Sequence, residues 1–269
     1  MTENRMPGVA IVTGAAGGMG SASARQLAAL GWPLILCDID AGRLEEIATP
    51  LRAHGQRIEI LPGNIADPSF PDQLIAAIGN RPVGAMVHAA GLSPTMGDAA
   101  LILAVNYDAT ARLVEAVRPR MAEGACAVLI ASSSGYAMSA PEYDAALDAI
   151  GPGGDSSSLL KITTHPGMAY ALSKRGVLQM VERQAALFGE RKARIASISP
   201  GLIDTAMGRA EQKASPQMET MLAKTPLGRY GTADEIASVA VFLCSPAASF
   251  ISGSDIKVDG GVLAVLAHE

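Results

Sequence analysis

Short, nearly all-apolar runs alternate with longer segments along most of the chain. Runs of this length and composition, bounded by turn residues, are typical of buried strands. The predicted strands are residues 9–12, 33–38, 57–61, 83–88, 125–130, 193–198 and 255–258. The segments between them have helix length, and the predicted helices are residues 18–30, 41–53, 71–78, 98–118, 168–188 and 233–243.

This alternation predicts an α/β protein with a doubly wound Rossmann fold. Strands that are apolar on both sides are typical of parallel sheets covered by helices on both faces. Right-handed βαβ units then build a parallel sheet of about seven strands. We expect one such domain over residues 1–269.

Two segments interrupt the alternation. Residues 139–166 form a long irregular stretch with glycines at 151, 153 and 154, and a loop of this length is usually functional or disordered. We predict an insertion there. Residues 204–225 are polar and rich in methionine, and we predict that they form a flexible segment beside the substrate.

The first predicted strand leads into a glycine-rich turn at residues 13–20 and then into a helix. Glycine permits a tight turn and lets the backbone approach a pyrophosphate, whose charge a helix N-terminus stabilises. An ordinary βα turn is the alternative for a glycine run taken alone.

Asp38 supports a dinucleotide site. It ends the second predicted strand 24 residues after Gly14, near the distance at which an acid accepts hydrogen bonds from the adenosine ribose. Its charge would repel a 2′-phosphate, and the turn offers no Arg or Lys to bind one. The pattern favours NAD over NADP, while nearby Arg43 keeps NADP as an alternative.

Tyr170 and Lys174 lie four residues apart, so they share one face of a helix. A phenol normally titrates near 10 and is a poor base at neutral pH. A neighbouring ammonium and the positive ring of oxidised nicotinamide would lower its pKa and improve proton transfer. The alternative is an exposed Tyr/Lys pair on a solvated helix.

These motifs occur together in an order that resembles the short-chain dehydrogenase/reductase family, and the resemblance covers essentially the whole chain. Within the family, the 38-residue spacing from Ser132 to Tyr170 and the closing sequence resemble bacterial 3α-hydroxysteroid dehydrogenase/carbonyl reductases. The motifs that carry the resemblance are the glycine turn, Ala89-Ala90-Gly91, Asn106, Ser132, Tyr170-x-x-x-Lys174, Pro200-Gly201, Ser245-Pro-Ala-Ala-Ser249 and Val258-Asp259-Gly260-Gly261.

The resemblance implies roles for four catalytic residues. Tyr170 would be the general acid/base, and Lys174 would bind the nicotinamide ribose and lower the tyrosine pKa. Ser132 would hold the substrate oxygen, and Asn106 would anchor the water of a proton relay. Ser132 is preferred to its two neighbouring serines because the family's serine lies three residues before a glycine, here Gly135.

The resemblance also implies a set of cofactor contacts, among which Thr205 would contact the nicotinamide carboxamide. The sequence departs from the family at two places. His88 replaces a frequent Asn and is interpreted as structural, and Asn64 replaces a frequent Asp, so its contact with adenine would use the backbone. The implied cofactor residues are Gly14, Ala16, Gly18, Met19, Gly20, Asp38, Ile39, Asn64, Ile65, Ala89, Ala90, Gly91, Tyr170, Lys174, Pro200, Gly201, Ile203 and Thr205.

Composition excludes several other classes. Aromatic residues are 4% and the net charge is −5, which argues against a nucleic-acid partner. No apolar run approaches the roughly 18 residues of a membrane span, and the polar start suggests no signal peptide, so we expect a cytoplasmic protein. The three cysteines and four histidines are scattered, so we expect neither disulfides nor a metal site.

The leading hypothesis is an NAD-dependent oxidoreductase that interconverts a secondary alcohol and its ketone, with an apolar alicyclic or steroid-like substrate. One alternative is an NADPH-dependent 3-oxoacyl or carbonyl reductase, and another is a non-catalytic dinucleotide-binding sensor. The family's habit of pairing helices implies a homodimer or homotetramer. The insertion at 139–166 is interpreted either as part of a substrate lid or as a block to one subunit interface.

Overall fold

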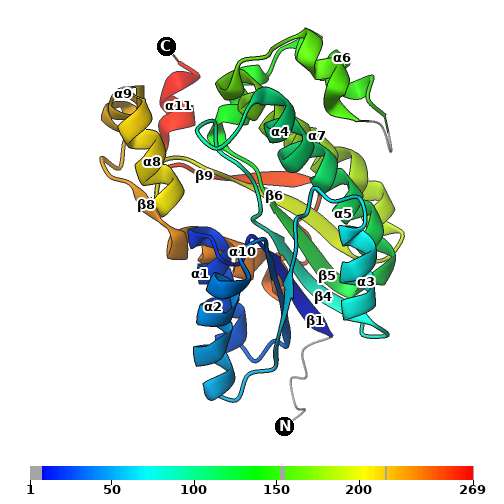
Figure 1. The fold of residues 1–269 in the computed structure, drawn as a ribbon. Coiled ribbons are helices and arrows are strands. Elements are labelled where there is room, and N and C mark those ends of the chain that lie inside the picture. Colours follow the sequence, from blue (N-terminus) through cyan, green and yellow to red (C-terminus); the bar gives the residue numbers. More distant parts are fainter. Residues whose placement is uncertain (1–7, 152–154, 216, 269) are drawn as a thin grey trace.

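The computed structural model describes residues 8–151, 155–215 and 217–268, built around a seven-stranded parallel sheet (Figure 1). The strand order is β3-β2-β1-β4-β5-β6-β9, so the chain starts in the middle of the sheet and winds outward in both directions. This confirms the predicted doubly wound fold. The strands are β1 (Val9–Thr13), β2 (Leu34–Asp38), β3 (Ile58–Pro62), β4 (Val83–His88), β5 (Met121–Ile130), β6 (Arg194–Pro200) and β9 (Ser254–Val258).

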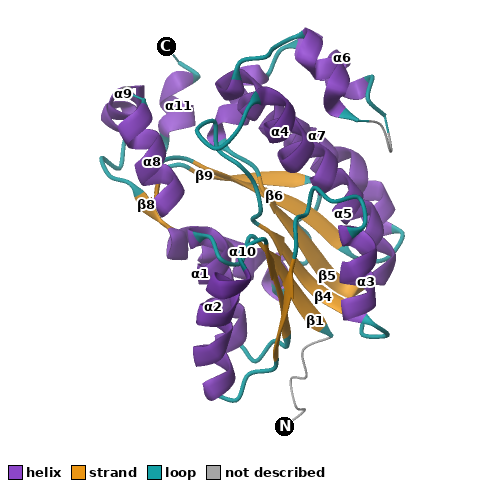
Figure 2. Cartoon of the chain, viewed as in Figure 1, coloured by secondary structure: helices purple, strands orange, loops and turns teal. Residues whose placement is uncertain are grey.

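Helices cover both faces of the sheet, as Figure 2 shows. One face carries α1 (Gly18–Ala29), α2 (Ala41–Ala53) and α10 (Ala233–Cys244); the other carries α3 (Phe70–Ile78), α4 (Ala99–Leu103), α5 (Ala109–Val117) and α7 (Pro166–Gly189). Successive residues of β1 alternate between the two apolar cores, with Val9 and Ile11 in one and Ala10 and Val12 in the other. Both sides of the strand are therefore buried, which explains its unbroken apolar sequence.

The helix predicted over residues 98–118 is not continuous. A π-helical turn, η1 (Ala104–Asp108), separates α4 from α5, and a 3-10 turn, η2 (Arg118–Arg120), follows α5. π-turns widen the helix locally and are frequent at functional sites. The apolar periodicity does not reveal this turn, because a single widened turn shifts the pattern only slightly.

The segment predicted to be irregular, residues 139–166, contains two helices, so that prediction is wrong in part. They are α6 (Pro141–Asp148) and the 3-10 helix η4 (Ser156–Lys161), and they follow another 3-10 helix, η3 (Ser133–Met138). Leu147 and Leu159 are fully buried. Both helices are short, which is why periodicity did not detect them. Residues 152–154, in the glycine run, lie outside the described residues.

Polar contacts also fasten this insertion to the helices behind it. The Asp108 carboxylate accepts hydrogen bonds from the backbone N–H and the hydroxyl of Ser156, both at 2.9 Å. Arg175 donates two hydrogen bonds, of 2.7 and 2.8 Å, to the Asp144 carboxylate. The insertion is thus packed against η1 and α7, and Figure 1 shows α6 beside α4 and α7.

The segment predicted to be flexible, residues 204–225, contains two helices. These are α8 (Ala206–Ala214) and α9 (Gln217–Lys224), which stand near α11 (Val262–Leu266) in Figure 1. Thr205 caps α8 by accepting a 3.0 Å hydrogen bond from the backbone N–H of Gly208. No residue of α8 is fully buried, so the helix lies on the surface of the domain. The remaining elements are β7 (Ile203–Asp204), β8 (Gly231–Thr232) and η5 (Pro246–Ala248).

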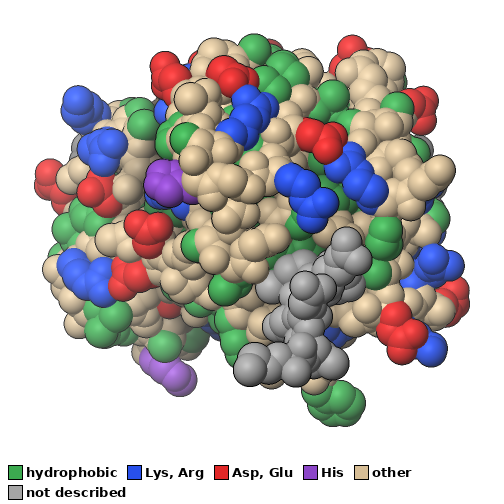
Figure 3. All heavy atoms as spheres, turned by 90° about the horizontal axis from the view of Figure 1, so that it is seen from below, with side chains coloured by type: hydrophobic (Ala, Val, Ile, Leu, Met, Phe, Trp, Pro, Cys, Tyr) green, Lys and Arg blue, Asp and Glu red, His purple; other side chains and the backbone are tan. Residues whose placement is uncertain are grey.

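Acidic and basic side chains lie side by side on the face seen in Figure 3, with no large area of one sign. Among the described residues, no helix is both long and apolar enough to cross a bilayer. The same residues contain no group of three His, Cys, Asp or Glu side chains arranged to hold a metal ion.

Candidate active site

A cleft of about 560 Å³ follows the carboxyl ends of the central strands. The glycine turn after β1, the end of β2, the loop after β4 and the start of α8 line it. The chain leaves β1 toward one edge of the sheet and returns at β4 toward the other. Ligands of open α/β sheets bind at such a switch point.

The glycine turn fits closely against the loop after β4. Gly14 has φ +64°, and a Cβ there would lie 2.6 Å from the backbone nitrogen of Ala90. Only glycine is compatible with both conditions. A Cβ on Gly18 would lie 2.7 Å from Cγ2 of Thr205, so the start of α1 touches the segment that leads into α8.

The first turn of α1 is suited to phosphate groups. Its N-cap is Gly17, which has no side chain to cap the helix, and the first turn carries no acidic residue. The first backbone N–H groups of a helix have no partner within the helix and favour an anion. Together with the bare backbone at Gly14, this end of the cleft fits the pyrophosphate of a dinucleotide.

Asp38 is held at the end of β2, on the wall of the cleft. One carboxylate oxygen accepts a 3.0 Å hydrogen bond from the backbone N–H of Ala16, and the other accepts a 3.2 Å bond from that of Asp40. These bonds fix the carboxylate beside the glycine turn. Arg43 lines the same cleft. The cleft therefore holds a negative charge that would repel a 2′-phosphate and a positive charge that would attract one.

Most of the residues that the resemblance implied as cofactor contacts line the cleft. Cleft residues that sequence reasoning missed include Gly63, Ser93 and Ala210, and their only signal is a position shortly after a strand or within the segment 204–225. The implied residues that line it are Gly14, Ala16, Gly18, Met19, Gly20, Asp38, Ile39, Asn64, Ile65, Ala89, Ala90, Gly91 and Thr205.

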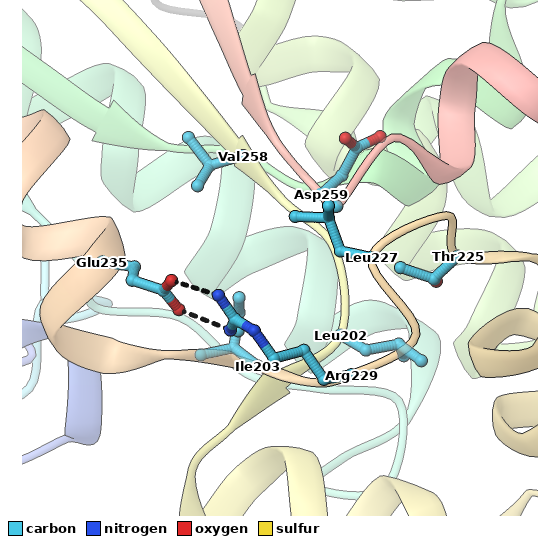
Figure 4. A pocket seen from close by; sticks show the side chains of 10 residues that line it. Leu202, Ile203, Thr225, Leu227, Arg229, Glu235, Val258 and Asp259 are labelled. Carbon is cyan, nitrogen blue, oxygen red and sulfur yellow. Dashed lines mark hydrogen bonds and ion pairs between the residues drawn. The ribbon is translucent and has the colours of Figure 1, made fainter.

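Five implied cofactor residues do not line the cleft: Tyr170, Lys174, Pro200, Gly201 and Ile203. The backbone N–H of Gly201 instead donates a 3.1 Å hydrogen bond to the carbonyl of Val258. Ile203 lines a separate pocket of about 80 Å³ (Figure 4). This pocket is far too small for a dinucleotide.

Lys174 is almost fully buried, with 6% exposure. Its ammonium donates a 2.8 Å hydrogen bond to the carbonyl of Ile130 at the end of β5 and lies 5.7 Å from the centre of the Tyr170 ring. Burial lowers the pKa of Lys174 to about 8, against the opposing charge of Glu211. A Cβ at Gly91 would lie 3.6 Å from this ammonium, so the missing side chain keeps the space beside it open.

Ser132 and Tyr170 meet through their hydroxyl groups. Burial raises the pKa of Tyr170 to about 12, and the hydrogen bond with Ser132 lowers it only in part. The sequence led us to expect a lowered pKa, and the protein alone gives the opposite direction. The expected lowering stays a prediction for the enzyme with an oxidised, positively charged nicotinamide ring beside the phenol.

The position of Ser132 depends on the close packing of η3 against α7. A Cβ at Gly135 would lie 3.0 Å from the carbonyl carbon of Lys174, so the glycine lets the two helices approach. Ser132 is the N-cap of η3, and its hydroxyl oxygen accepts hydrogen bonds from the backbone and the hydroxyl of Ser134. The structure therefore brings Ser132, the serine chosen from the sequence, to Tyr170.

Asn106 lies in the π-turn η1 and fastens the loop after β4. Its side-chain amide accepts a 2.7 Å hydrogen bond from the backbone N–H of Leu92 and donates a 2.9 Å bond to the carbonyl of the same residue. The amide also donates to Ser173, whose hydroxyl donates to the carbonyl of Tyr170. Its role as the anchor of a relay water stays a prediction.

His88 is 2% exposed and joins β1 to the first turn of α5. Thr110 donates its hydroxyl proton to the carbonyl of Asn106, so it accepts from Nε2 of His88 at 2.8 Å. The network then assigns Nδ1 of His88 as the acceptor for Thr13, at 2.7 Å. Burial lowers the pKa of His88 to about 3, helped by the charge of Lys174, so the ring is a neutral structural link.

Comparison with known proteins identifies two family matches. Residues 8–146 match the family described as short chain dehydrogenase, and residues 155–263 match one described as enoyl-(acyl carrier protein) reductase. The two matched ranges include every residue that lines the cleft and the four candidate catalytic residues.

Individual proteins are similar over almost the full length. A 3-alpha-hydroxysteroid dehydrogenase/carbonyl reductase from Comamonas testosteroni is 31% identical, covering 96% of this chain and 97% of its own. A galactitol 2-dehydrogenase (L-tagatose-forming) from Cereibacter sphaeroides is also 31% identical, covering 94% and 93%. The crystal structure of a 3-alpha-hydroxysteroid dehydrogenase from Pseudomonas sp. B-0831, complexed with NADH, has a TM-score of 0.77 and 27% identity, covering 97% and 99%.

Proposed function

This chain belongs to the short-chain dehydrogenase/reductase family, and from that premise we propose that it is an NAD-dependent oxidoreductase that interconverts a secondary alcohol and its ketone. The observation that carries the proposal is the placement of three candidate catalytic groups beside the cleft. The Ser132–Tyr170 hydroxyl pair and the Lys174 ammonium adjoin a cleft that ends at a glycine turn and Asp38. When bound, the nicotinamide dinucleotide accepts the hydride from the carbinol carbon or returns it.

The side chains of this protein handle the proton and the oxygen. Tyr170 takes the hydroxyl proton of the alcohol during oxidation and returns it during reduction. Ser132 donates a hydrogen bond to the substrate oxygen as negative charge develops there. Lys174 holds a positive charge near the phenol, because its carbonyl partner and its burial fix its position. This charge favours the phenolate in the loaded enzyme.

The choice of NAD over NADP rests on Asp38. Its carboxylate is fixed beside the glycine turn, and a negative charge there disfavours a 2′-phosphate. Arg43 on the same cleft wall could offset part of this repulsion. NADH and NADPH affinities, measured by quenching of protein fluorescence, test the choice. We expect NADH to bind more tightly than NADPH by a factor of about 10 or more. The Asp38→Ala substitution should reduce this difference in affinity.

The walls of the cleft support an apolar substrate body. Leu92, Met96 and Met207 line it. A spectrophotometric screen of cyclic and steroidal secondary alcohols with NAD and NADP tests the proposed function. Oxidation of none of them by the wild-type protein would contradict it. A clear preference for NADPH and 3-oxo substrates would favour the reductase alternative instead.

We also propose that the insertion bears on assembly rather than on the cleft. None of the described residues between 139 and 165 lines the cleft, whereas Leu147 and Leu159 pack against the core beside α7. Such packing supports the interpretation that the insertion covers a helix face otherwise available to another subunit. We expect a homodimer in light scattering, and a tetramer at micromolar concentration would contradict the proposal.

A further inference from the structure

Glu211 is a half-buried carboxylate that the proposed reaction does not use. It lies on α8, four residues after Met207 and next to Ala210, and both of these residues line the cleft. Residues four apart on a helix share one face. Glu211 therefore lies on the side of α8 that faces the catalytic cleft.

Three groups from other elements face this carboxylate. Ser93, in the loop after β4, lines the cleft and makes a hydrogen bond with Glu211. The charge of Glu211 also interacts with the Lys174 ammonium and the Tyr170 phenol, both on α7. The carboxylate is thus directed toward the residues that handle the substrate oxygen, not toward solvent alone.

The Lys174 ammonium attracts the Glu211 carboxylate without a direct ion pair between them. Across the described residues, no Lys or Arg forms an ion pair with it; the nearby Arg209 pairs with Asp204 instead. Burial raises the pKa of Glu211, while the bond with Ser93 and the charge of Lys174 lower it. A carboxylate taken partly out of water without an ion pair is unfavourable, unless a ligand donates to it.

We propose that Glu211 determines specificity by accepting a hydrogen bond from a second polar group of the substrate. This rests on the proposed function, because it concerns the alcohol that the same site oxidises. The apolar walls formed by Leu92, Met96 and Met207 contact the body of that alcohol. The substrate class is therefore a secondary alcohol with an apolar ring or chain that carries one further donor, a hydroxyl or an ammonium.

The same arrangement discriminates against other substrates. A purely apolar alcohol shields the carboxylate from water and adds no donor to the one from Ser93, and an anionic alcohol is repelled by it. When a substrate analogue lacks the group that would pair with a polar group of the site, the site rejects that analogue strongly.

Two variants and one matched control test the proposal. Glu211→Leu removes the acceptor, and Glu211→Gln keeps an acceptor oxygen but removes the charge. Gln212→Leu alters the next residue of α8, which is exposed. Each protein is assayed with NAD and with cyclohexanol, the 1,2-, 1,3- and 1,4-cyclohexanediols, and 4-aminocyclohexanol.

For the wild type we expect kcat/KM for at least one donor-bearing alcohol to exceed that for cyclohexanol by about 10-fold or more. Glu211→Leu should abolish this advantage, mainly by raising KM. Glu211→Gln should retain a preference for the diol but lose one for the amine, and Gln212→Leu should behave as the wild type. Comparison of the diols with 4-aminocyclohexanol therefore identifies whether the site recognises a hydroxyl or an ammonium donor.

A binding measurement separates this proposal from the proposed function. The same alcohols are titrated into the enzyme–NADH complex and followed by NADH fluorescence, which requires no turnover. Equal binding of cyclohexanol and every donor-bearing alcohol by the wild type, or an unchanged preference in Glu211→Leu, would overturn the role of Glu211. If binding discriminates through Glu211 while no alcohol is oxidised, the proposed function fails and the role of Glu211 stands.

Discussion

Two sides of the candidate active site are built in different ways. One side, which adjoins the cleft and which we call the catalytic floor, consists of His88, Asn106, Ser132, Tyr170 and Lys174. His88, Asn106 and Lys174 are nearly inaccessible, and each has a short hydrogen bond to another element. The other side is α8, which has no buried residue and is held by the Thr205 cap and an exposed ion pair.

This difference indicates that the two sides have different roles. Moving a group of the floor would leave buried partners unsatisfied, at about 1–3 kcal/mol each, so the reacting groups keep their geometry. The exposed positions of α8 can change at little energetic expense. The fixed side therefore suits the chemistry that family members share, and the adaptable side suits recognition of a particular substrate.

The largest effect is expected from Tyr170→Phe, which removes only the phenolic oxygen of the floor. Without a proton donor and acceptor, kcat should fall by about 10²–10⁴-fold. NADH affinity, measured by fluorescence, should stay near the wild-type value, which serves as the control for folding. Turnover within a few-fold of the wild type would show that another group moves the proton.

The insertion should resemble the floor rather than α8, although the sequence suggested an irregular stretch. Leu147→Ala removes a fully buried side chain and should lower the free energy of unfolding by about 2–5 kcal/mol. Leu187→Ala, at a position 38% exposed, is the matched control and should cost less than about 1 kcal/mol. Urea denaturation measures both, and equal small effects would mean that the insertion is not integrated into the core.

Acid should weaken the floor through His88. Its folded pKa of about 3 lies below the ordinary value of 6.5, so the unfolded chain binds the proton first as the pH falls. The stability is complete above pH 6.5 and is lost progressively below it, by about 2–3 kcal/mol at pH 4.5. His88→Asn has no such titration, so its unfolding free energy should fall less between pH 7 and 4.5. Urea denaturation at both pH values measures this change. An equal fall in unfolding free energy for the wild type and His88→Asn would contradict a neutral buried histidine.

The smallest effect is expected on α8 itself. Lys213→Ala replaces an exposed side chain near the end of the helix and should change the free energy of unfolding by less than about 0.5 kcal/mol. Thermal and urea denaturation measure the change, and kcat/KM for cyclohexanol should stay unchanged. If Lys213→Ala lowered the free energy of unfolding as much as Leu147→Ala does, α8 would not differ from the catalytic floor in its tolerance of substitution.

Much of the fold and the nucleotide end of the cleft was predictable from sequence, because the signals there are local. Each central strand is buried on both faces, so its apolar run marks it directly. The glycine turn and Asp38 are recognised by residue type and spacing, and the structure places them together on the cleft wall. The order of the catalytic residues also resembles the family, which singled out Ser132 before its packing was known.

The remainder depends on contacts between residues far apart in the chain. Glu211 meets Ser93, which is 118 residues earlier, and no periodicity in either segment indicates it. The upward direction of the Tyr170 pKa follows from burial, which only the assembled helices create. The π-turn at Asn106 and the docking of α6 likewise arise from packing. Sequence by itself determined the strands and the turn and identified candidates for the reacting groups; tertiary structure decided the burial, the electrostatics and the neighbours of these residues, because those quantities are sums over distant atoms.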